Sequence, residues 1–555
     1  MKSLRTASLL GFLGILSLGL SFVPFSRSQD PQGKHDSVAI TIASATAKVE
    51  AAGPAGIRYY LDGLKLFREE KFSAAATDFE AAANSETAAL LRSHAYAWLA
   101  RAELHLHNLP AAESAAERAL ENTRDASNAQ TATAEVYFRE GKIAEAQQIL
   151  QPLVKSQAAG SRTFFALAKI YLATGNYKAA KALLEAAHKM DPKDPDVKEA
   201  RVWSLTREER LQELKKRMED GNFEEQEEKA PITDMIAVLE DRQEHQNRTC
   251  KLVSNVTKTE IKLSPLPYEA KHIRGYSLSV KVNGALASLV LDSGTGGILV
   301  SSKIAEKAGL SKIADSLVHG VGDAGPAKGY LAFVEKLKIG DLEFENCYVQ
   351  VIDNRKALED DGLIGTNVFE NYLIDLDFPE GKLRLSQLPS YPNELRAQPS
   401  LNSEPNSTSH LHNNWTPPEF ADFEKVYRFG HMLLLPVGLN RAPARLFLLD
   451  TGAFDNSVSP AAAKEASKIS RDSDIRVKGL IEEVTTGFTS GNMLLTFGHF
   501  QQRGDLVALD MSRISNSVGT EVSGTLGLAM LEHLEIKLDY RDNLVQFRYE
   551  ANRIH

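Results

Sequence analysis

Two patterns of hydrophobic and polar positions divide the chain. From about residue 55 to 205, apolar side chains recur three and four positions apart, and Gly, Asn or Pro interrupt the pattern. This spacing predicts successive α-helices, each with one apolar face. From about residue 250, short stretches alternate apolar and polar positions, and residues 276–282 run into the hairpin-turn pair Asn283-Gly284. These features predict β-strands. The expected fold is multidomain, with an all-α region followed by an all-β region.

The helical region contains a repeat. Four apolar residues that recur along it each have an alanine three positions later: Phe72, Leu109, Ile143 and Tyr177. A small residue that recurs about every 34 positions suits pairs of helices that cross closely. Residues 55–205 therefore resemble tetratricopeptide repeats, which implies a surface that binds a protein partner. An Ala-rich helical bundle without superhelical order is the alternative.

The segment between the two regions is strongly charged. Residues 206–249 contain the runs REER, at 207–210, and EEQEE, at 224–228. Such runs are typical of an exposed helix or a linker. We therefore expect a charged helical linker with no binding role.

The N-terminus has the features of an export signal. Lys2 and Arg5 precede an apolar stretch from about Leu9 to Val23, and the small residues Ser26 and Ser28 follow. This order predicts a signal peptide over residues 1–28 and an exported protein, either periplasmic or secreted. An uncleaved segment, which would anchor the chain to a membrane, is the alternative.

Two apolar stretches in the β-rich region end in the same way. The sequence LVLDSGT covers residues 289–295, and LFLLDTGA covers residues 446–453. Each places an aspartate, Asp292 or Asp450, directly after a predicted buried strand. The structural alternative is that both aspartates cap ordinary turns, since Asp-Ser-Gly and Asp-Thr-Gly are common in turns.

The surroundings of the two motifs also repeat. LIG at 363–365 corresponds to TLG at 525–527, and at the same offset Asp377 and Leu383 correspond to Asp539 and Val545. One unit of the sequence is therefore duplicated. The expected lobes are residues 250–388 and 425–552, and the Pro-, Ser- and Asn-rich stretch at 389–424 is the expected linker.

At these motifs the chain resembles the pepsin and retropepsin superfamily of aspartic peptidases, specifically its bacterial retropepsin-like branch, over about residues 255–550. The resemblance implies two β-barrel lobes around a pseudo-twofold axis and an endopeptidase acting on a protein or peptide substrate. Two neighbouring carboxylates share one proton and activate a water molecule, so the resemblance implies no metal and no cofactor.

The family's roles transfer to individual positions. Asp292 and Asp450 would be the catalytic pair. The Ser293 and Thr451 hydroxyls would brace the two active-site loops against each other, and Gly294 and Gly452 would allow a tight turn. Thr295 and Ala453 complete the loops. The first loop has an extra glycine and the second has Ala453 where Ser or Thr is common, and both departures would loosen the loops.

A flap that closes over the substrate is expected a short way beyond each aspartate in the chain. The candidate in the first lobe is the stretch Gly320, Val321, Gly322 and Asp323, and the candidate in the second is the region around 479–487. The first stretch also fits a Gly-x-Gly-x-x-Gly dinucleotide pattern. Pro326 and Gly329 follow where that pattern requires a helix, so we reject that interpretation. A plain surface hairpin is the alternative to a flap.

Composition narrows the function further. Hydrophobic residues make up 43% of the chain, charged residues 25%, and the net charge is −9. This balance is typical of a soluble globular protein, and without a Lys/Arg cluster nucleic acid is not an expected partner. The two cysteines, Cys250 and Cys347, would be either one disulfide or two unrelated thiols. The alternative function is an exported binding or assembly factor with a decayed peptidase fold. A separate alternative concerns the lobes, which would pair between two chains instead of within one.

Overall fold

A computed structural model describes residues 54–549 except for short stretches at 86–87, 124–125, 157, 203–204, 221–225, 246–247, 249, 270–271, 319–326, 353–360, 392–412, 467–469, 473–476, 479–482, 485–486 and 490–491. The chain divides into two compact units. Within the described range, the first comprises residues 54–171 and 178–206, and the second comprises residues 207–549 together with 172–177. The predicted signal peptide lies outside the described residues. No helix that the structure describes is long and apolar enough to cross a membrane.

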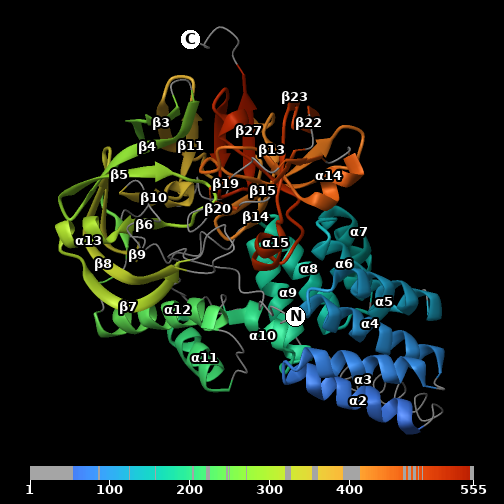
Figure 1. The fold of residues 1–555 in the computed structure, drawn as a ribbon. Helices are drawn as coiled ribbons and strands as arrows, with labels where there is room; N and C mark the ends of the chain where they lie inside the picture. The colour runs from blue at the N-terminus through green and yellow to red at the C-terminus, as the bar shows by residue number, and fades with distance from the viewer. Residues whose placement is uncertain are drawn as a thin grey trace. The chain divides into compact units, whose positions relative to one another are not determined.

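The first unit is a series of antiparallel helix pairs (Figure 1). Its helices are α2 (Pro54–Arg68), α3 (Phe72–Asn84), α4 (Ala89–His105), α5 (Leu109–Asn122), α6 (Ser127–Arg139), α7 (Ile143–Lys155), α8 (Ser161–Ala173), α9 (Tyr177–Met190) and α10 (Pro195–Val202). The four apolar residues of the sequence repeat are the first residues of α3, α5, α7 and α9. Their alanine partners are fully buried: Ala75, Ala112, Ala146 and Ala180. A methyl side chain lets neighbouring helices approach closely, which explains the repeat.

Buried charges also connect the helices of the first unit. Arg101 of α4 is 1% exposed, and its Nε donates to Glu135 Oε2 of α6 at 2.6 Å. Arg162 of α8 donates to the other oxygen of Glu135 at 2.5 Å and to Asp196 at 2.6 Å. Each buried charge therefore has an opposite charge in contact, which offsets the cost of removing it from water.

The charged segment is helical, as expected, but it is not a solvated linker. It forms α11 (Arg207–Asp220) and α12 (Gln226–Glu244), and α12 lies along β7 (Ser311–Val318) (Figure 1). Val238 of α12 is buried in a cluster with Leu331, Phe333 and Tyr348. Asp234 accepts a hydrogen bond from Ser316 Oγ at 2.5 Å. The apolar face of α12 was not apparent from the sequence, because the charged residues of this helix outnumber the apolar residues that pack against the first lobe.

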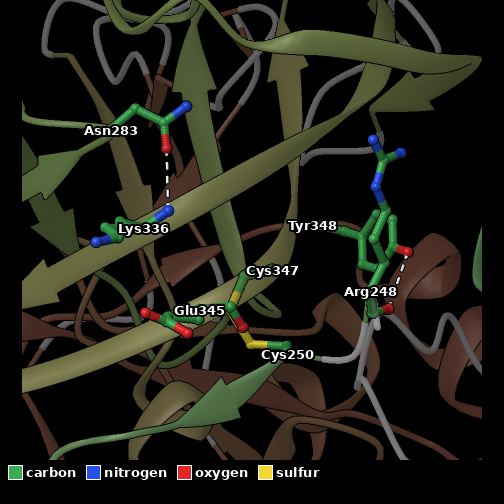
Figure 2. The surroundings of a disulfide bond; sticks show 7 residues. All are labelled: Arg248, Cys250, Asn283, Lys336, Glu345, Cys347 and Tyr348. Atoms are coloured by element: carbon green, nitrogen blue, oxygen red, sulfur yellow. Dashed lines mark hydrogen bonds between the residues drawn. A yellow bond between two sulfur atoms is a disulfide. The ribbon is translucent and has the colours of Figure 1, made fainter. Parts of the chain in front are cut away.

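A disulfide fixes the end of this segment to the first lobe. Cys250 bonds to Cys347 of β9 (Leu342–Ile352), with their Cα atoms 4.2 Å apart (Figure 2). Beside it, the hydroxyl of Tyr348 lies 3.2 Å from the backbone oxygen of Arg248 (Figure 2). The shorter hydrogen bond of this hydroxyl, at 2.7 Å, is donated to Asp241 Oδ2. The structure thus joins the two cysteines whose pairing the sequence left open.

The second unit contains two lobes built on the same plan. The first has β1 (Lys251–Leu252), β2 (Lys258–Lys262), β3 (Ser264–Glu269), β4 (His272–Val282), β5 (Ala285–Leu291), β6 (Ile298–Ser301), α13 (Ser302–Ala308), β7, β8 (Ala327–Ile339), β9, β10 (Gly362–Ile364), η1 (Thr366–Phe369), β11 (Tyr372–Asp377) and β12 (Lys382–Gln387). Its main sheet has the order β1-β9-β6-β10-β5-β4-β8-β7. The parallel neighbour of β5 is β10, and β6 lies antiparallel on the other side of β10.

The second lobe follows η4 (Pro418–Phe420), which falls within the predicted inter-lobe linker. Its elements are β13 (Glu424–Lys425), β14 (Tyr427–Phe429), β15 (Met432–Leu439), β16 (Arg445–Leu449), β17 (Ser457–Val458), α14 (Pro460–Ala466), β18 (Ser470–Asp472), β19 (Val477–Lys478), β20 (Glu483–Val484), β21 (Gly487–Thr489), β22 (Met493–Phe497), β23 (Phe500–Gly504), β24 (Val507–Ala508), α15 (Ser512–Val518), β25 (Gly524–Leu526), α16 (Leu528–Leu531), β26 (Glu535–Asp539) and β27 (Leu544–Arg548). The parallel neighbour of β16 is β25, and β17 lies antiparallel to β25. Both lobes thus have the same local topology around their aspartates.

Matched turns show the duplication at the level of single atoms. Asn283 and Asn440 both have a positive φ, 45° and 52°, which asparagine tolerates better than most residues. Asn283 Oδ1 accepts the backbone N–H of Lys336 at 3.0 Å (Figure 2), and Asn440 Oδ1 accepts that of Leu494 at 3.0 Å. The same residue type therefore closes the same turn in each lobe.

One sheet is shared by both lobes. Its strand order is β13-β27-β26-β11-β12-β2, so β11 of the first lobe pairs with β26 of the second. Asp375 lies directly opposite Lys537 in this register. These two positions are equivalent in the duplicated unit, because they are separated along the chain by the same number of residues as LIG and TLG. The pseudo-twofold axis that relates the lobes therefore passes between them. A single continuous sheet holds the two lobes together through backbone hydrogen bonds.

The equivalent aspartates of this sheet have different partners. Asp377 is fully buried and accepts from Arg384 Nη1 at 2.8 Å. Asp539 is also fully buried, but Gln546 occupies the position that corresponds to Arg384. Burial and the charge of nearby Asp542 raise the pKa of Asp539 to about 6, although the charge of Arg541 acts in the opposite direction.

Candidate active site

The two aspartates of the duplicated motif are placed by equivalent strand ends. Asp292 follows β5, and its backbone N–H donates to Ile364 O of β10 at 3.0 Å. Asp450 follows β16, and its backbone N–H donates to Leu526 O of β25 at 3.0 Å. The parallel strand beside each aspartate therefore fixes where its loop begins.

The glycine after each neighbouring strand is required by close packing. A Cβ on Gly365 would lie 2.2 Å from the Thr295 carbonyl oxygen, and one on Gly527 would lie 2.4 Å from the Asp455 carbonyl oxygen. The Gly365 N–H donates to Gly297 O at 2.7 Å. These contacts explain why a glycine ends both LIG and TLG: the aspartate loop lies directly against it.

Reciprocal hydrogen bonds join the two loops. Ser293 Oγ donates to Leu449 O at 2.7 Å and accepts the backbone N–H of Thr451 at 3.0 Å. Thr451 Oγ1 donates to Leu291 O at 3.1 Å and accepts the backbone N–H of Ser293 at 3.0 Å. Both hydroxyl residues are at most 2% exposed. The four bonds hold the two strand ends, and hence the two aspartates, at a fixed separation.

The two carboxyl groups face each other across the loops, within one chain. A Cβ on Gly452 would lie 2.4 Å from Asp292 Cγ, and one on Gly294 would lie 3.0 Å from Asp450 Cγ. Neither glycine has a positive φ. Both lie in turns, but a turn without a positive φ does not by itself require glycine. They are glycines because each leaves room for the carboxyl group of the other lobe.

The contact between the two carboxyl groups changes the pKa of one of them. Burial raises the pKa of Asp450, and the Asp292 carboxyl raises it further through its charge and a side-chain hydrogen bond. Two carboxyl groups in such contact cannot both ionise freely, so the pair retains a proton to a higher pH than an isolated aspartate does.

A histidine that the sequence did not single out completes the first loop. His431, between β14 and β15, donates from Nε2 to Gly294 O at 3.0 Å. Its Nδ1 would be 2.7 Å from a Cβ on Gly296, so the glycine expected to loosen the loop makes room for this ring. Burial lowers the pKa of His431, which keeps the ring neutral. No sequence signal links His431 to a loop that lies so much earlier in the chain.

Other predicted features are only partly described. Gly320, Val321, Gly322 and Asp323 lie outside the described residues. In the region around 479–487, β19 and β20 pair as a short antiparallel hairpin. Among the described residues, no group of three or more His, Cys, Asp or Glu side chains is arranged to hold a metal ion.

The second unit is thus a two-lobed β domain in which two aspartates meet, and helical repeats precede it in the chain. Residues 278–368 match the family model described as "Aspartyl protease". Residues 105–194 match the family model described as "Anaphase-promoting complex, cyclosome, subunit 3". The first match covers Asp292 and its loop, and the second covers helical repeats. The predicted resemblance and the predicted order of the two fold classes are confirmed.

Individual proteins also match, among them one curated relative and one solved structure. The UBA domain-containing protein Mud1 of Schizosaccharomyces pombe is 28% identical over 137 residues, which are 24% of this chain and 40% of that protein. The chain therefore spans two fifths of the length of this curated relative. A crystal structure of a retropepsin-like aspartic protease from Rickettsia conorii is 19% identical and covers 23% of this chain and 90% of that one, with a TM-score of 0.18.

Proposed function

We propose that the protein is an aspartic endopeptidase that hydrolyses peptide bonds with Asp292 and Asp450 as its catalytic pair. The observation that carries the proposal is the meeting of the two carboxyl groups over Gly294 and Gly452, where a side chain of any size would collide with them. A proton-sharing pair can act as base and acid at once, so one carboxylate accepts a proton from water while the other donates to the peptide carbonyl. The aspartyl protease match over residues 278–368 supports the same chemistry.

Cleavage of an unstructured protein tests the proposal. The full chain is expected to cleave casein, and Asp292→Asn and Asp450→Asn are each expected to abolish cleavage, because an amide can neither accept nor release the proton. Asp315→Asn is the matched control, since the Asp315 side chain is 88% exposed. Full activity in Asp292→Asn would refute the assignment. A wild-type chain that folds but never cleaves would favour a binding or assembly role.

We further propose that the helical repeats recruit a protein substrate or partner. The match of residues 105–194 and the stacked helix pairs support this role, since stacked repeats generate an extended binding surface. Recruitment predicts a lower KM for a protein substrate than for a short peptide with the same cleaved sequence, while kcat stays similar. Equal KM values for the two substrates would argue against recruitment.

Export is the third part of the proposal. It is supported by the signal-peptide pattern of residues 1–28 and by the Cys250–Cys347 disulfide, because structural disulfides persist in oxidising compartments. N-terminal sequencing of the protein from its native source is expected to start just after residue 28. A mature chain that begins at Met1 would instead indicate a retained segment that anchors the protein to a membrane.

A further inference from the structure

The two aspartates of the pair do not receive the same hydrogen bonds. Asp292 Oδ1 accepts the backbone N–H of Gly294 at 2.8 Å, and Asp292 Oδ2 accepts the hydroxyl of Thr295 at 2.6 Å. Both oxygens of Asp292 therefore have a donor from their own loop. A short hydroxyl-to-carboxylate bond stabilises the ionised form.

Asp450 has a different arrangement. Its Oδ1 accepts both the backbone N–H of Gly452 and that of Ala453, each at 3.0 Å. Ala453 stands where the first loop has Thr295, so it has no hydroxyl to offer to the second oxygen. Asp450 Oδ2 therefore lacks the counterpart of the Thr295 bond, and that oxygen is the better place for a proton.

The charged groups around the pair do not reverse this difference. The charge of Asp292 itself disfavours ionisation of Asp450. His431 packs against the first loop, and burial lowers its pKa, so the ring is neutral. Arg428, on the neighbouring β14, is paired with Glu370 at 2.6 Å and donates to the Tyr540 carbonyl at 2.8 Å. Tyr540 stays neutral because burial raises its pKa to about 12. The hydroxyl present on one loop and absent from the other is thus the main asymmetry.

We propose that Thr295 and Ala453 assign the roles within the pair: Asp292 is the ionised base and Asp450 carries the shared proton. This inference rests on the proposed peptidase function. Asp292 accepts a proton from water as the water oxygen bonds to the peptide carbonyl carbon, and Asp450 donates its proton to the carbonyl oxygen. When the C–N bond breaks, Asp292 gives its proton to the leaving nitrogen and Asp450 recovers one from the tetrahedral intermediate. The pair ends as it began, and one water molecule has been consumed.

The test is the pH profile of kcat/KM, whose two limbs report the two ionisations of the pair. Ala453→Thr, with Ala453→Ser as a smaller second variant, supplies the missing hydroxyl. It is expected to lower the upper apparent pKa by about one unit, since a charge-assisted hydrogen bond is worth at least that much. Thr295→Ala is expected to raise the lower apparent pKa instead, and Thr295→Ser, which keeps the hydroxyl, is expected to leave both limbs in place.

A second measurement keeps this test separate from the peptidase assignment. Carboxyl ¹³C shifts of aspartate-labelled protein report the same two ionisations without turnover, and Asp450→Asn identifies the Asp450 signal. The expected result is a signal for Asp450 that titrates above that of Asp292 and moves down in Ala453→Thr or Ala453→Ser. The proposal is overturned if Asp292 titrates above Asp450, or if folded variants of Ala453 leave the upper pKa unchanged. A chain that shows the shifts but never cleaves would refute only the peptidase function.

Discussion

Loss of one inter-loop hydroxyl is expected to destabilise the second unit much more than a single surface change would. Thr451→Val removes the hydroxyl while it preserves the branched shape. Thr451 Oγ1 bonds to the backbone of both Leu291 and Ser293, and all three residues are at most 2% exposed. The variant therefore leaves one carbonyl and one N–H buried with a partner missing.

The size of the effect follows from those two groups. A buried polar group that loses its partner costs about 1–3 kcal/mol, so the two groups together should lower the free energy of unfolding of Thr451→Val by about 2–6 kcal/mol. Thr451→Ser retains both bonds and loses only a methyl group, so its cost should stay near about 1 kcal/mol. The contrast between the two variants isolates the hydroxyl from the loss of volume.

Urea unfolding of the second unit, followed by fluorescence, measures the difference in stability between the two variants. The comparison is made on transition midpoints, because a chain with two compact units need not unfold in one step. Ser293→Ala, alone and combined with Thr451→Val, completes a double-mutant cycle. The two losses should couple by at least about 0.5 kcal/mol, since both hydroxyls brace the same pair of loops. If Thr451→Val and Thr451→Ser have equal midpoints, the inter-loop bonds do not stabilise the pair and the reasoning is wrong.

Three further outcomes follow from other parts of the structure. Cys250→Ser combined with Cys347→Ser opens a loop of 97 residues, and the added chain entropy of the unfolded state should cost up to about 4–5 kcal/mol. The urea midpoint of this variant should be lower than that of the oxidised wild type, and a reductant should no longer change it. A midpoint equal to that of the oxidised wild type would contradict this expectation. Asp539 holds a proton in the folded state up to a pH of about 6, whereas the unfolded chain releases it near 4, so this group's contribution to stability falls as pH rises through that window. Asp539→Asn should therefore flatten the pH dependence of unfolding between about pH 4 and 6, and an unchanged slope would count against the raised pKa. Arg101→Met removes one of the two cations on buried Glu135 and should destabilise the first unit by about 3–5 kcal/mol in thermal unfolding, while an effect under about 1 kcal/mol would show that Arg162 alone compensates.

The sequence was most informative where structure depends on neighbours along the chain. The regular period of the helical region predicted the helix pairs, because the alanines that permit close crossing lie within the same short segments as the apolar residues that begin the helices. The two Asp-containing motifs predicted equivalent strand ends for the same reason: a strand followed by a turn is a local arrangement. The offset shared by LIG and TLG, by Asp377 and Asp539, and by Leu383 and Val545 then indicated two similar lobes.

Distance along the chain explains what the sequence did not reveal. The contact of His431 with the first loop, the Cys250–Cys347 bond and the packing of α12 on β7 each join residues far apart in sequence, with no periodicity to show them. The reason for Gly294 and Gly452 was also missed, because a glycine that makes room for a distant side chain looks the same in sequence as one that makes a turn.

The sequence by itself determined the two fold classes, the repeats and the pair of aspartates at strand ends. Only the tertiary structure decided that the aspartates meet within one chain, because that meeting depends on the pairing of β11 with β26 and on hydroxyls that reach the opposite loop. Local pattern fixes the elements through short-range sterics and burial. The relation between two carboxyl groups that belong to different lobes is set by the packing of whole lobes, which no local pattern contains.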